Sequence, residues 1–286
     1  MEIIRSPQEM TLWSEKIISG NQSIALVPTM GYFHEGHLSL MRKARTLADH
    51  VAVSLFVNPI QFGPSEDLEK YPRDFDRDKD LAAAQGVSVL FAPETIDMYP
   101  EKLLTRVQVS EITGTLCGSS RPGHFEGVAT VVAKLFNIIM PHFAVFGQKD
   151  FQQLAVIKKM VRDLNFAVQV IGHPIVREVD GLAMSSRNTY LSKDERRSAL
   201  CLIESIRLAR KRIGQGLLDA DKLIEEIKEL FDSYSNITVE YVDIVNKDNL
   251  KSMTEVNTMS MLVLAAKAGK TRLIDNNMLF EGSEIV

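Results

Sequence analysis

Short apolar runs alternate with amphipathic stretches through the first part of the chain. The apolar runs at 24–27, 51–57, 87–92 and 143–146 are short enough to be strands buried on both faces. Charged segments with helical spacing, such as 74–85, lie between them. Because strands that alternate with helices connect most simply through right-handed parallel crossovers, we predict an α/β fold with a Rossmann-like, doubly wound parallel sheet.

The pattern changes towards the C-terminus. Ser192 and Glu195 have the spacing of a capping box, and helical periodicity continues from there to about residue 213. A further helix is expected to end near residue 233. Three strands follow, at 237–245, 259–266 and 271–275. We therefore predict two domains: a Rossmann-like, nucleotide-binding catalytic domain at 1–176 and a smaller α+β C-terminal lid domain at 177–286.

One turn joins the first apolar run to a helix and carries polar residues suited to an anion. Pro28 is expected to end the strand, and Gly31 allows a sharp turn before helical spacing begins near His37. A helix that starts at the carboxyl end of a parallel strand offers unpaired N–H groups and a positive end, which bind phosphate. His34 and His37 are three residues apart near this helix start, so they can face the same bound group.

The turn lacks the sequences of three common sites. No Gly-Lys-Ser/Thr follows its glycine as in a Walker A loop, and Gly-x-Gly-x-x-Gly of dinucleotide-binding proteins is absent. Zinc proteases need two histidines four residues apart on one helix, whereas these two are three apart. The turn therefore predicts an anion site of another class.

Composition narrows the class of protein. The 286 residues are 45% hydrophobic and 24% charged, as in globular proteins, and no apolar run approaches the ~20 residues that span a membrane. A net charge of −4 argues against a general nucleic-acid binder. Cys117 and Cys201 are far apart and have no metal-binding spacing, which favours free thiols in a reducing compartment. The N-terminus lacks a secretory pattern, which together with the free thiols predicts a cytoplasmic protein. The net charge and the lack of a long apolar run predict no nucleic-acid or membrane partner.

The turn, with PTMG at 28–31 and HEGHLSL at 34–40, resembles the signature of the pantothenate synthetase family, the pantoate–β-alanine ligases. This family belongs to the nucleotidyltransferases with a His-x-Gly-His motif. Further similar motifs follow in order: FVNP at 56–59 with QF at 61–62, RPGH at 121–124, GQKD at 147–150 with QQ at 152–153, and MSSRN at 184–188. The similarity is dense from 26 to 191 and thinner beyond, where KTRLIDN at 270–276 again matches.

The resemblance implies an AMP-forming carboxylate–amine ligase. Such an enzyme condenses pantoate with β-alanine to pantothenate through a pantoyl-adenylate intermediate, and it releases AMP and pyrophosphate. The first step brings a carboxylate against the α-phosphorus of ATP, so the site must gather cations and hydrogen-bond donors around the phosphates. The resemblance also implies Mg²⁺ carried by ATP, with no metal ligand from protein side chains, and a homodimer.

Carried over residue by residue, the resemblance assigns catalysis to His37, His34 and Lys149. The implied ATP-binding residues are Met30, Gly31, His34, His37, Gly147, Gln148, Lys149, Asp150, Val176, Met184, Ser185, Ser186 and Arg187. The implied residues for pantoate and β-alanine are Pro28, Met30, Gln61 and Gln153.

Each group suits a role in that reaction. His37 titrates near neutrality and is expected to donate a proton to the departing pyrophosphate. Lys149 supplies a point charge for the α-phosphate, and Arg187, with the two serines before it, would hold the β- and γ-phosphates. Asp150 would accept hydrogen bonds from the ribose hydroxyls, and Gln61 would bind the polar half of pantoate.

The chain departs from related patterns at two places. Enzymes with a Lys-Met-Ser-Lys-Ser loop use lysines there, whereas this chain has Ala183 before Met184 and Arg187 as the cation. Tyr32 and Phe33 are bulkier than the small pair expected between the glycine and the first histidine.

The sequence alone leaves three other readings open. An ordinary nucleotidyltransferase acting on a phosphorylated small molecule would share the histidine motif, but it needs a basic pocket where Gln61 and Gln153 stand. An aminoacyl-tRNA synthetase would need a basic tRNA-binding surface after Arg187. A non-catalytic nucleotide-binding regulator would have no reason to retain both histidines, Lys149 and Arg187.

Overall fold

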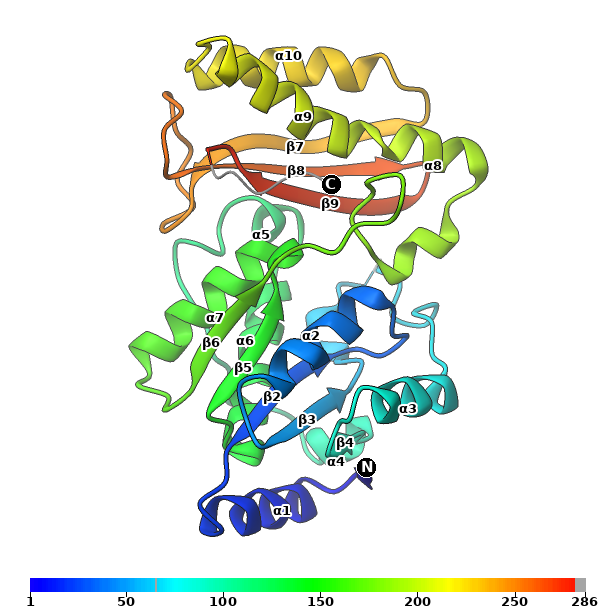
Figure 1. Cartoon of the computed structure of the whole chain (residues 1–286), viewed down its shortest axis with the longest axis vertical. Helices are drawn as coiled ribbons and strands as arrows, with labels where there is room; N and C mark the ends of the chain where they lie inside the picture. Colours follow the sequence, from blue (N-terminus) through cyan, green and yellow to red (C-terminus); the bar gives the residue numbers. More distant parts are fainter. Residues whose placement is uncertain (65, 281–286) are drawn as a thin grey trace. The chain divides into compact units, whose positions relative to one another are not determined.

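A parallel sheet organises the first of two compact units in the chain (Figure 1). The computed structural model describes residues 1–64 and 66–280. The first unit is Met1–Gln148 with Gln152–Pro174, and the second is Lys149–Phe151 with the described chain from Ile175 onward.

Within the described residues, the sheet of the first unit has six strands in the order β1-β4-β3-β2-β5-β6, and all pairs are parallel. The strands are β1 (Glu2–Ile4), β2 (Ile24–Thr29), β3 (His50–Leu55), β4 (Val89–Phe91), β5 (Phe143–Gly147) and β6 (Gln169–His173). From β2 the chain continues through β3 to β4 towards one edge of the sheet, and from β5 it continues to β6 at the other edge. This order confirms the predicted doubly wound sheet, and its switch point lies at the carboxyl ends of β2 and β5.

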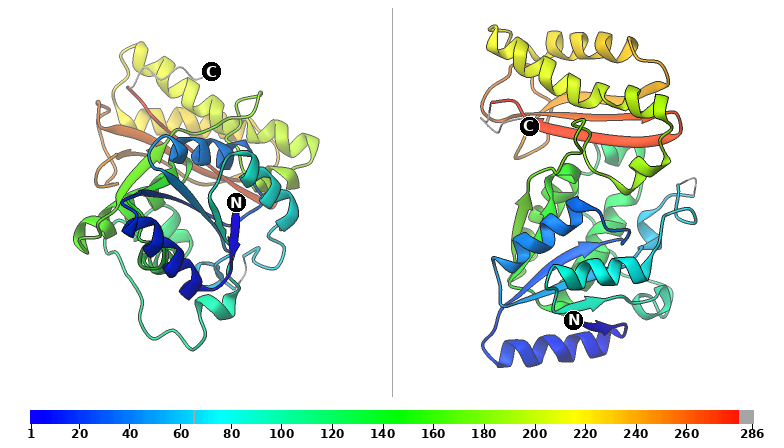
Figure 2. Two further views of the ribbon diagram at one scale, coloured as in Figure 1. Left: turned by 60° about the horizontal axis from the view of Figure 1, so that its bottom comes forward. Right: turned by 45° about the vertical axis from the view of Figure 1, so that its right-hand side comes forward.

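Helices cover both faces of this sheet. The helices in this part of the chain are α1 (Pro7–Ser19), α2 (Glu35–Arg45), α3 (Phe75–Ala84), α4 (Thr95–Met98), α5 (Cys117–Ser120), α6 (His124–Ile139) and α7 (Phe151–Asp163). Short 3-10 turns are η1 (Pro59–Gln61) and η2 (Gln148–Asp150). Because parallel crossovers are right-handed, α2 and α3 lie on one face, and α1 and α6 lie on the other (Figure 2).

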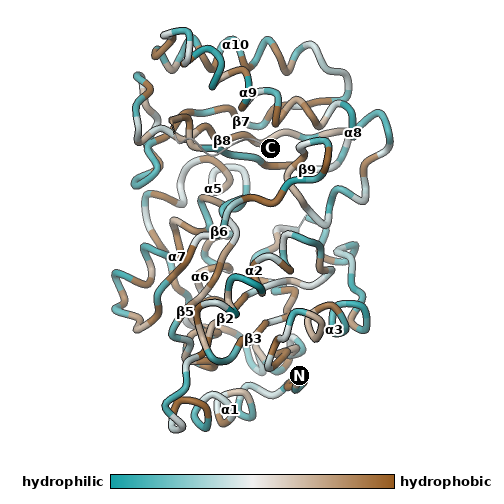
Figure 3. The backbone as a smooth tube through the Cα atoms, in the orientation of Figure 1, coloured by the Kyte–Doolittle hydropathy of each residue, from teal (hydrophilic) through white to brown (hydrophobic). Residues whose placement is uncertain are grey.

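Strand β2 is buried from both sides. Ala25 and Val27 pack in one apolar cluster with Met41 of α2, while Ile24 and Leu26, which point to the opposite face, are also fully buried. This explains why its sequence is continuously apolar rather than alternating. Hydrophobic residues are likewise concentrated along β3 and β5 of this sheet (Figure 3).

Pro28 lies inside β2, so the prediction that it ends the strand was wrong. It pairs with Ser54 of β3, and the ladder continues to Thr29. The Thr29 carbonyl accepts from Phe56 on the β3 side, whereas the Ile24 carbonyl accepts from His142 on the β5 side. By alternation Pro28 faces β5, where pairing ends at Leu26, and no N–H donor is needed there.

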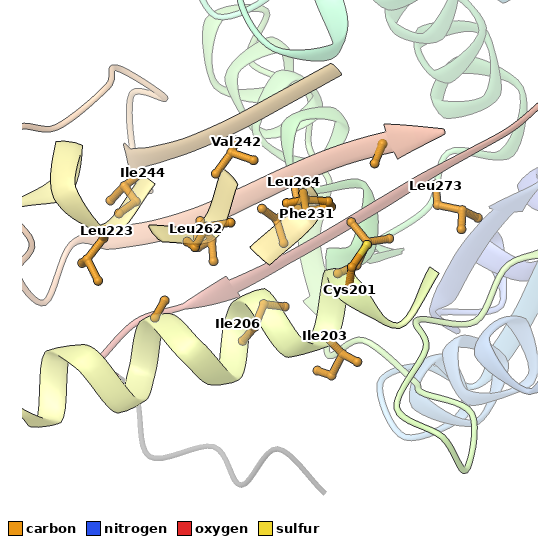
Figure 4. Packing of buried hydrophobic residues seen from close by; sticks show 14 of the residues in the cluster. Cys201, Ile203, Ile206, Leu223, Phe231, Val242, Ile244, Leu262, Leu264 and Leu273 are labelled. Atoms are coloured by element: carbon orange, nitrogen blue, oxygen red, sulfur yellow. The ribbon is translucent and has the colours of Figure 1, made fainter. Parts of the chain in front are cut away.

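The second unit contains, among residues 175–280, a three-stranded antiparallel sheet of β7 (Ile237–Asn246), β8 (Ser260–Ala268) and β9 (Thr271–Met278). Its helical elements are η3 (Ser186–Tyr190), α8 (Lys193–Ala199), α9 (Cys201–Gly214) and α10 (Ala220–Asp232). Cys201 and Ile206 of α9 and Phe231 of α10 pack with Leu262 and Leu264 of β8 (Figure 4). The predicted α+β class is confirmed.

The helix that starts at Ser192 is shorter than predicted. The capping box of Ser192 and Glu195 is present, but α8 ends at Ala199 and α9 begins at Cys201. At Leu200 the backbone N–H bonds to the Arg197 carbonyl three residues earlier, a tightened turn that separates the two helices.

Both cysteines are buried and neither forms a disulfide. Burial raises the pKa of the Cys201 thiol to about 12. Among the described residues, no helix combines the length and the apolar character that crossing a membrane requires.

Candidate active site

Two imidazole rings meet at the N-terminus of α2. His34 is the N-cap residue, and its Nδ1 accepts the Gly36 N–H at 3.1 Å. The Nδ1 of His37 accepts the His34 N–H at 3.3 Å, and the two ring centroids are 4.1 Å apart. Because Nδ1 of each ring accepts from the backbone, each neutral ring carries its proton on Nε2. The donor nitrogen of both neutral rings is therefore Nε2.

The turn before these rings is held by a buried carboxylate. Gly31 and Tyr32 both have positive φ, at 85° and 52°, so the chain reverses sharply after β2. Asp78 of α3 accepts the N–H groups of Tyr32 and Phe33 at 2.6 and 2.7 Å. A Cβ on Gly31 would lie 3.0 Å from an Asp78 oxygen, so glycine is needed for both its φ and its size.

The same turn accommodates the two bulky residues. Phe33 is fully buried in the cluster beside α2, and its ring centroid is 5.6 Å from that of His37. Tyr32 has the guanidinium of Arg77 5.2 Å from its ring centroid. Tyr32 and Phe33 therefore occupy separate environments, and both backbone N–H groups point to Asp78.

Asp78 is a residue that the sequence did not single out. It is 1% exposed, and burial raises the pKa of its carboxyl while the two accepted N–H groups oppose that shift. Within a run of alternating aspartates nothing distinguished it, because its partners are 45 and 46 residues away in sequence.

Asp78→Asn should destabilise the protein by about 1–3 kcal/mol, because an amide can accept only one of the two N–H groups and leaves the other buried without a partner. Denaturant unfolding measures the change. Asp76→Asn, on the same helix and paired at the surface with Lys79, is the matched control and should change stability little. Equal stability of the two variants would contradict the role of Asp78.

Met30 and Gln61, two predicted substrate residues, contact each other in the first unit. The Gln61 Nε2 lies 3.0 Å from the Met30 sulfur, and its Oε1 accepts from the Asn58 amide at 3.2 Å. The Tyr99 hydroxyl donates to the Asn58 Oδ1 at 2.9 Å. Burial raises the pKa of Tyr99 to about 12, so the hydroxyl remains a donor. This chain of contacts fixes the direction of the Gln61 amide.

Helix α6 approaches Gln61 closely through a glycine. A Cβ on Gly127 would lie 2.5 Å from the Ile60 carbonyl oxygen and 2.7 Å from the Gln61 backbone. The absence of a side chain therefore sets where η1 lies. Gln153 is half-buried in the first turn of α7, and Gly147 ends β5.

The second unit gathers the other predicted phosphate ligands. Lys149 donates from Nζ to the Met184 carbonyl at 2.9 Å. Burial lowers the pKa of Lys149 to about 8; Asp150 and Asp275 oppose this shift, and Arg187 contributes to it. The lysine, the aspartate beside it and Arg187 thus lie near one another.

The loop at 184–188 is part of a short hairpin. The Met184 N–H donates to the Val176 carbonyl at 3.0 Å, and Arg177 and Ala183 form a β-bridge. Ser185 caps η3 by accepting the Arg187 N–H at 3.3 Å. Val176 and the 184–187 loop, predicted from separate motifs, are therefore adjacent.

Ion pairs hold this hairpin at two points. Arg177 donates two hydrogen bonds to the buried carboxylate of Asp275, at 2.7 and 2.9 Å. Arg196 binds Glu178 and Asp180 at 2.6 and 2.8 Å. The sequence did not predict these partners, although Asp275 lies in the matched string at 270–276.

Comparison with known proteins gives a consistent family. The family model for pantoate-beta-alanine ligase matches residues 2–278. Pantothenate synthetase of Syntrophus aciditrophicus is 52% identical over 281 residues, with 98% of both chains covered. Pantothenate synthetase of a Thermoanaerobacter species is 55% identical over 262 residues, with 92% of both covered.

Solved structures agree with these matches. The crystal structure of pantothenate synthetase from Thermus thermophilus has a TM-score of 0.93 and 42% identity, and the match covers 98% of this chain and 100% of that one. Pantoate-beta-alanine ligase from Francisella tularensis, complexed with beta-gamma ATP and beta-alanine, has a TM-score of 0.82 and 34% identity, with 99% of each chain covered.

Proposed function

Because this chain belongs to the pantoate–β-alanine ligase family, we propose that it joins pantoate to β-alanine in an ATP-dependent reaction. A pantoate carboxylate oxygen attacks the α-phosphorus, the bond from the α-phosphorus to the bridging oxygen breaks, and pyrophosphate leaves. The β-alanine amine then attacks the acyl carbon of pantoyl adenylate. AMP leaves with the bonding electrons, the amine loses a proton, and pantothenate remains.

The paired imidazoles at the start of α2 carry this proposal. Both rings have Nδ1 engaged by backbone N–H groups, so Nε2 is the donor nitrogen of each neutral ring. We assign His34 to phosphate binding and His37 to proton donation to the departing pyrophosphate. Met30 and Gly31 lie in the same turn and belong to the proposed nucleotide site.

Lys149 and Arg187 supply positive charge to the phosphates in this proposal, with Ser185 and Ser186 as hydrogen-bond donors. Mg²⁺ is proposed to arrive with ATP, where it would neutralise phosphate charge. In the described part of the chain, no three His, Cys, Asp or Glu side chains gather into a metal site.

The remaining nucleotide contacts are assigned to Gly147, Gln148, Asp150, Val176 and Met184. Among the described residues other than its two chain neighbours, no atom lies within 4 Å of where a Cβ on Gly147 would stand, and its φ is not positive. The chain's own packing therefore does not require glycine there, which supports close approach of a ligand to its backbone.

For pantoate and β-alanine we propose Pro28, Met30, Gln61 and Gln153. Pantoate has hydroxyl groups and a gem-dimethyl group, so amides must combine with apolar side chains. The fixed Gln61 amide beside the Met30 thioether offers that combination. We further propose a cytoplasmic homodimer in which the second unit acts as a lid, on the basis of the family resemblance.

Gln153→Ala should raise the KM for pantoate by roughly 10-fold and the KM for ATP much less, since one hydrogen bond to substrate is lost. Steady-state kinetics with each substrate varied in turn measures both constants. Gln169→Ala, at an exposed position of β6, is the control and should change neither constant. An equal rise in both constants would remove Gln153 from the pantoate site.

Product analysis tests the proposed function directly. With ATP, pantoate and β-alanine, pantothenate, AMP and pyrophosphate should form in equal amounts. The alternative, a nucleotidyltransferase acting on a phosphorylated small molecule, would retain the nucleotidyl group in its product and release no AMP. Release of pyrophosphate without AMP when β-alanine is present would favour that alternative.

A further inference from the structure

Lys149 opens a three-residue segment that belongs to the second unit, although the chain on either side of that segment belongs to the first. Gln148 and Gln152 lie in the first unit, whereas Lys149–Phe151 group with the chain from Ile175 onward. The lysine thus follows β5 directly but takes its contacts from the C-terminal half of the sequence. Contacts within the second unit therefore fix the lysine.

Two contacts hold Lys149, one at each end of the residue. Its ammonium group donates to the Met184 carbonyl at 2.9 Å. Its own peptide carbonyl accepts a hydrogen bond from the side-chain amide of Asn276 at 2.8 Å. Asn276 is 5% exposed and stands on β9, 127 residues further along the chain. Because a carbonyl can only accept, this contact defines which end of the Asn276 amide faces the lysine.

Asn276 is itself firmly held. It pairs with Val263 in the β8–β9 ladder, and its backbone N–H donates to the Asp275 carboxylate at 2.8 Å. The same carboxylate accepts both hydrogen bonds from Arg177, which also donates to the Gly181 carbonyl at 3.1 Å. The amide that holds the backbone of Lys149 is therefore tied to the hairpin that leads to Met184, the partner of the ammonium group.

A lysine side chain is long and flexible, and its ammonium is a point charge without directional geometry. Its position depends on where the backbone starts and where the ammonium ends. We propose that Asn276 is a positioning residue for Lys149: its amide holds the lysine carbonyl and so directs the ammonium group towards the α-phosphate. This inference rests on the proposed role of Lys149, and it gives a function to the conspicuous string at 270–276.

The test uses pantoate-dependent pyrophosphate exchange into ATP by the full chain. Asn276→Ala should lower the exchange rate roughly 3- to 10-fold, as expected for one lost hydrogen bond. Asn276→Asp, of nearly the same size, should lower the exchange rate further, because a carboxylate oxygen would then face the Lys149 carbonyl oxygen and the two would repel each other. Asn277→Ala, which removes the neighbouring contact to Arg210, is the matched control and should leave exchange unchanged. If the alanine variant does not fold, Asn276→Thr keeps a residue suited to a strand and is too short to reach the carbonyl.

A double-mutant cycle separates positioning from a general structural effect. If Asn276 acts through Lys149, Asn276→Ala should reduce exchange in the native background but change it little in a Lys149→Ala background. Equal reductions in both backgrounds, or none in either, would overturn the inference while leaving the role of Lys149 intact. Full exchange activity of Lys149→Ala alone would instead refute the proposed role of Lys149, and the inference would fall with it.

Discussion

His37→Ala should lower kcat by roughly 10²- to 10⁴-fold, the range for loss of a positioned proton donor. The Nε2–H donor disappears, and pyrophosphate must then leave without a proton from this ring. The substitution also removes the acceptor for the His34 N–H, which should cost about 0.5–2 kcal/mol of folding free energy. Steady-state turnover and denaturant unfolding measure the two effects separately.

Two further variants separate catalysis from helix capping. His37→Asn keeps a short polar side chain that can accept the His34 N–H, so it should regain stability but remain slow. His50→Ala removes an imidazole that contacts Gln22 and the Trp13 ring, away from α2, and should retain kcat. Near-normal turnover of His37→Ala would exclude His37 as the proton donor.

The second large effect concerns Lys149. Lys149→Met should lower the rate of adenylate formation by roughly 10²- to 10³-fold, the range for loss of a hydrogen-bond donor that stabilises negative charge in the transition state. In the unsubstituted protein, kcat/KM for ATP should fall as the pH rises above about 8. Burial lowers the pKa of Lys149 to about 8, and above that pH the side chain loses the charge that phosphate requires. A pH profile of kcat/KM measures this alkaline limb.

Lys149→Arg is the matched variant for that profile. Arginine keeps its charge throughout the accessible pH range, so the alkaline limb should disappear even though the changed geometry lowers the rate at neutral pH. An alkaline limb that persists unchanged in Lys149→Arg would assign it to another group, and Lys149 would lose its proposed role.

Much of the fold could be predicted because a strand that is buried on both faces of a sheet has a continuous apolar sequence. The continuous apolar run at 24–27 identified β2, and similar runs identified β3 and β5. The errors concern the ends of strands, where pairing with a neighbouring strand outweighs the local preference of a residue. Pro28 stays within a strand because its neighbour β5 has already separated, and β9 continues past Asp275 through polar residues because β8 pairs with them.

The site was predictable only where its residues are local in sequence. His34 and His37 form one motif, and the adjacency of their rings follows from helix geometry. Asp78, Tyr99 and Asn276 left no such signal, since each acts through a partner at least 41 residues away. Their side chains are ordinary polar residues until the fold brings the partner to them.

The central claim is that a pantoyl adenylate forms before the amine reacts. It is tested most directly by exchange of labelled pyrophosphate into ATP, with Mg²⁺ and pantoate present and β-alanine absent. We predict rapid exchange that depends strictly on pantoate. Exchange that proceeds equally well without pantoate would contradict this claim. A lack of exchange, in an enzyme that makes pantothenate once β-alanine is added, would also contradict a freely reversible adenylate intermediate.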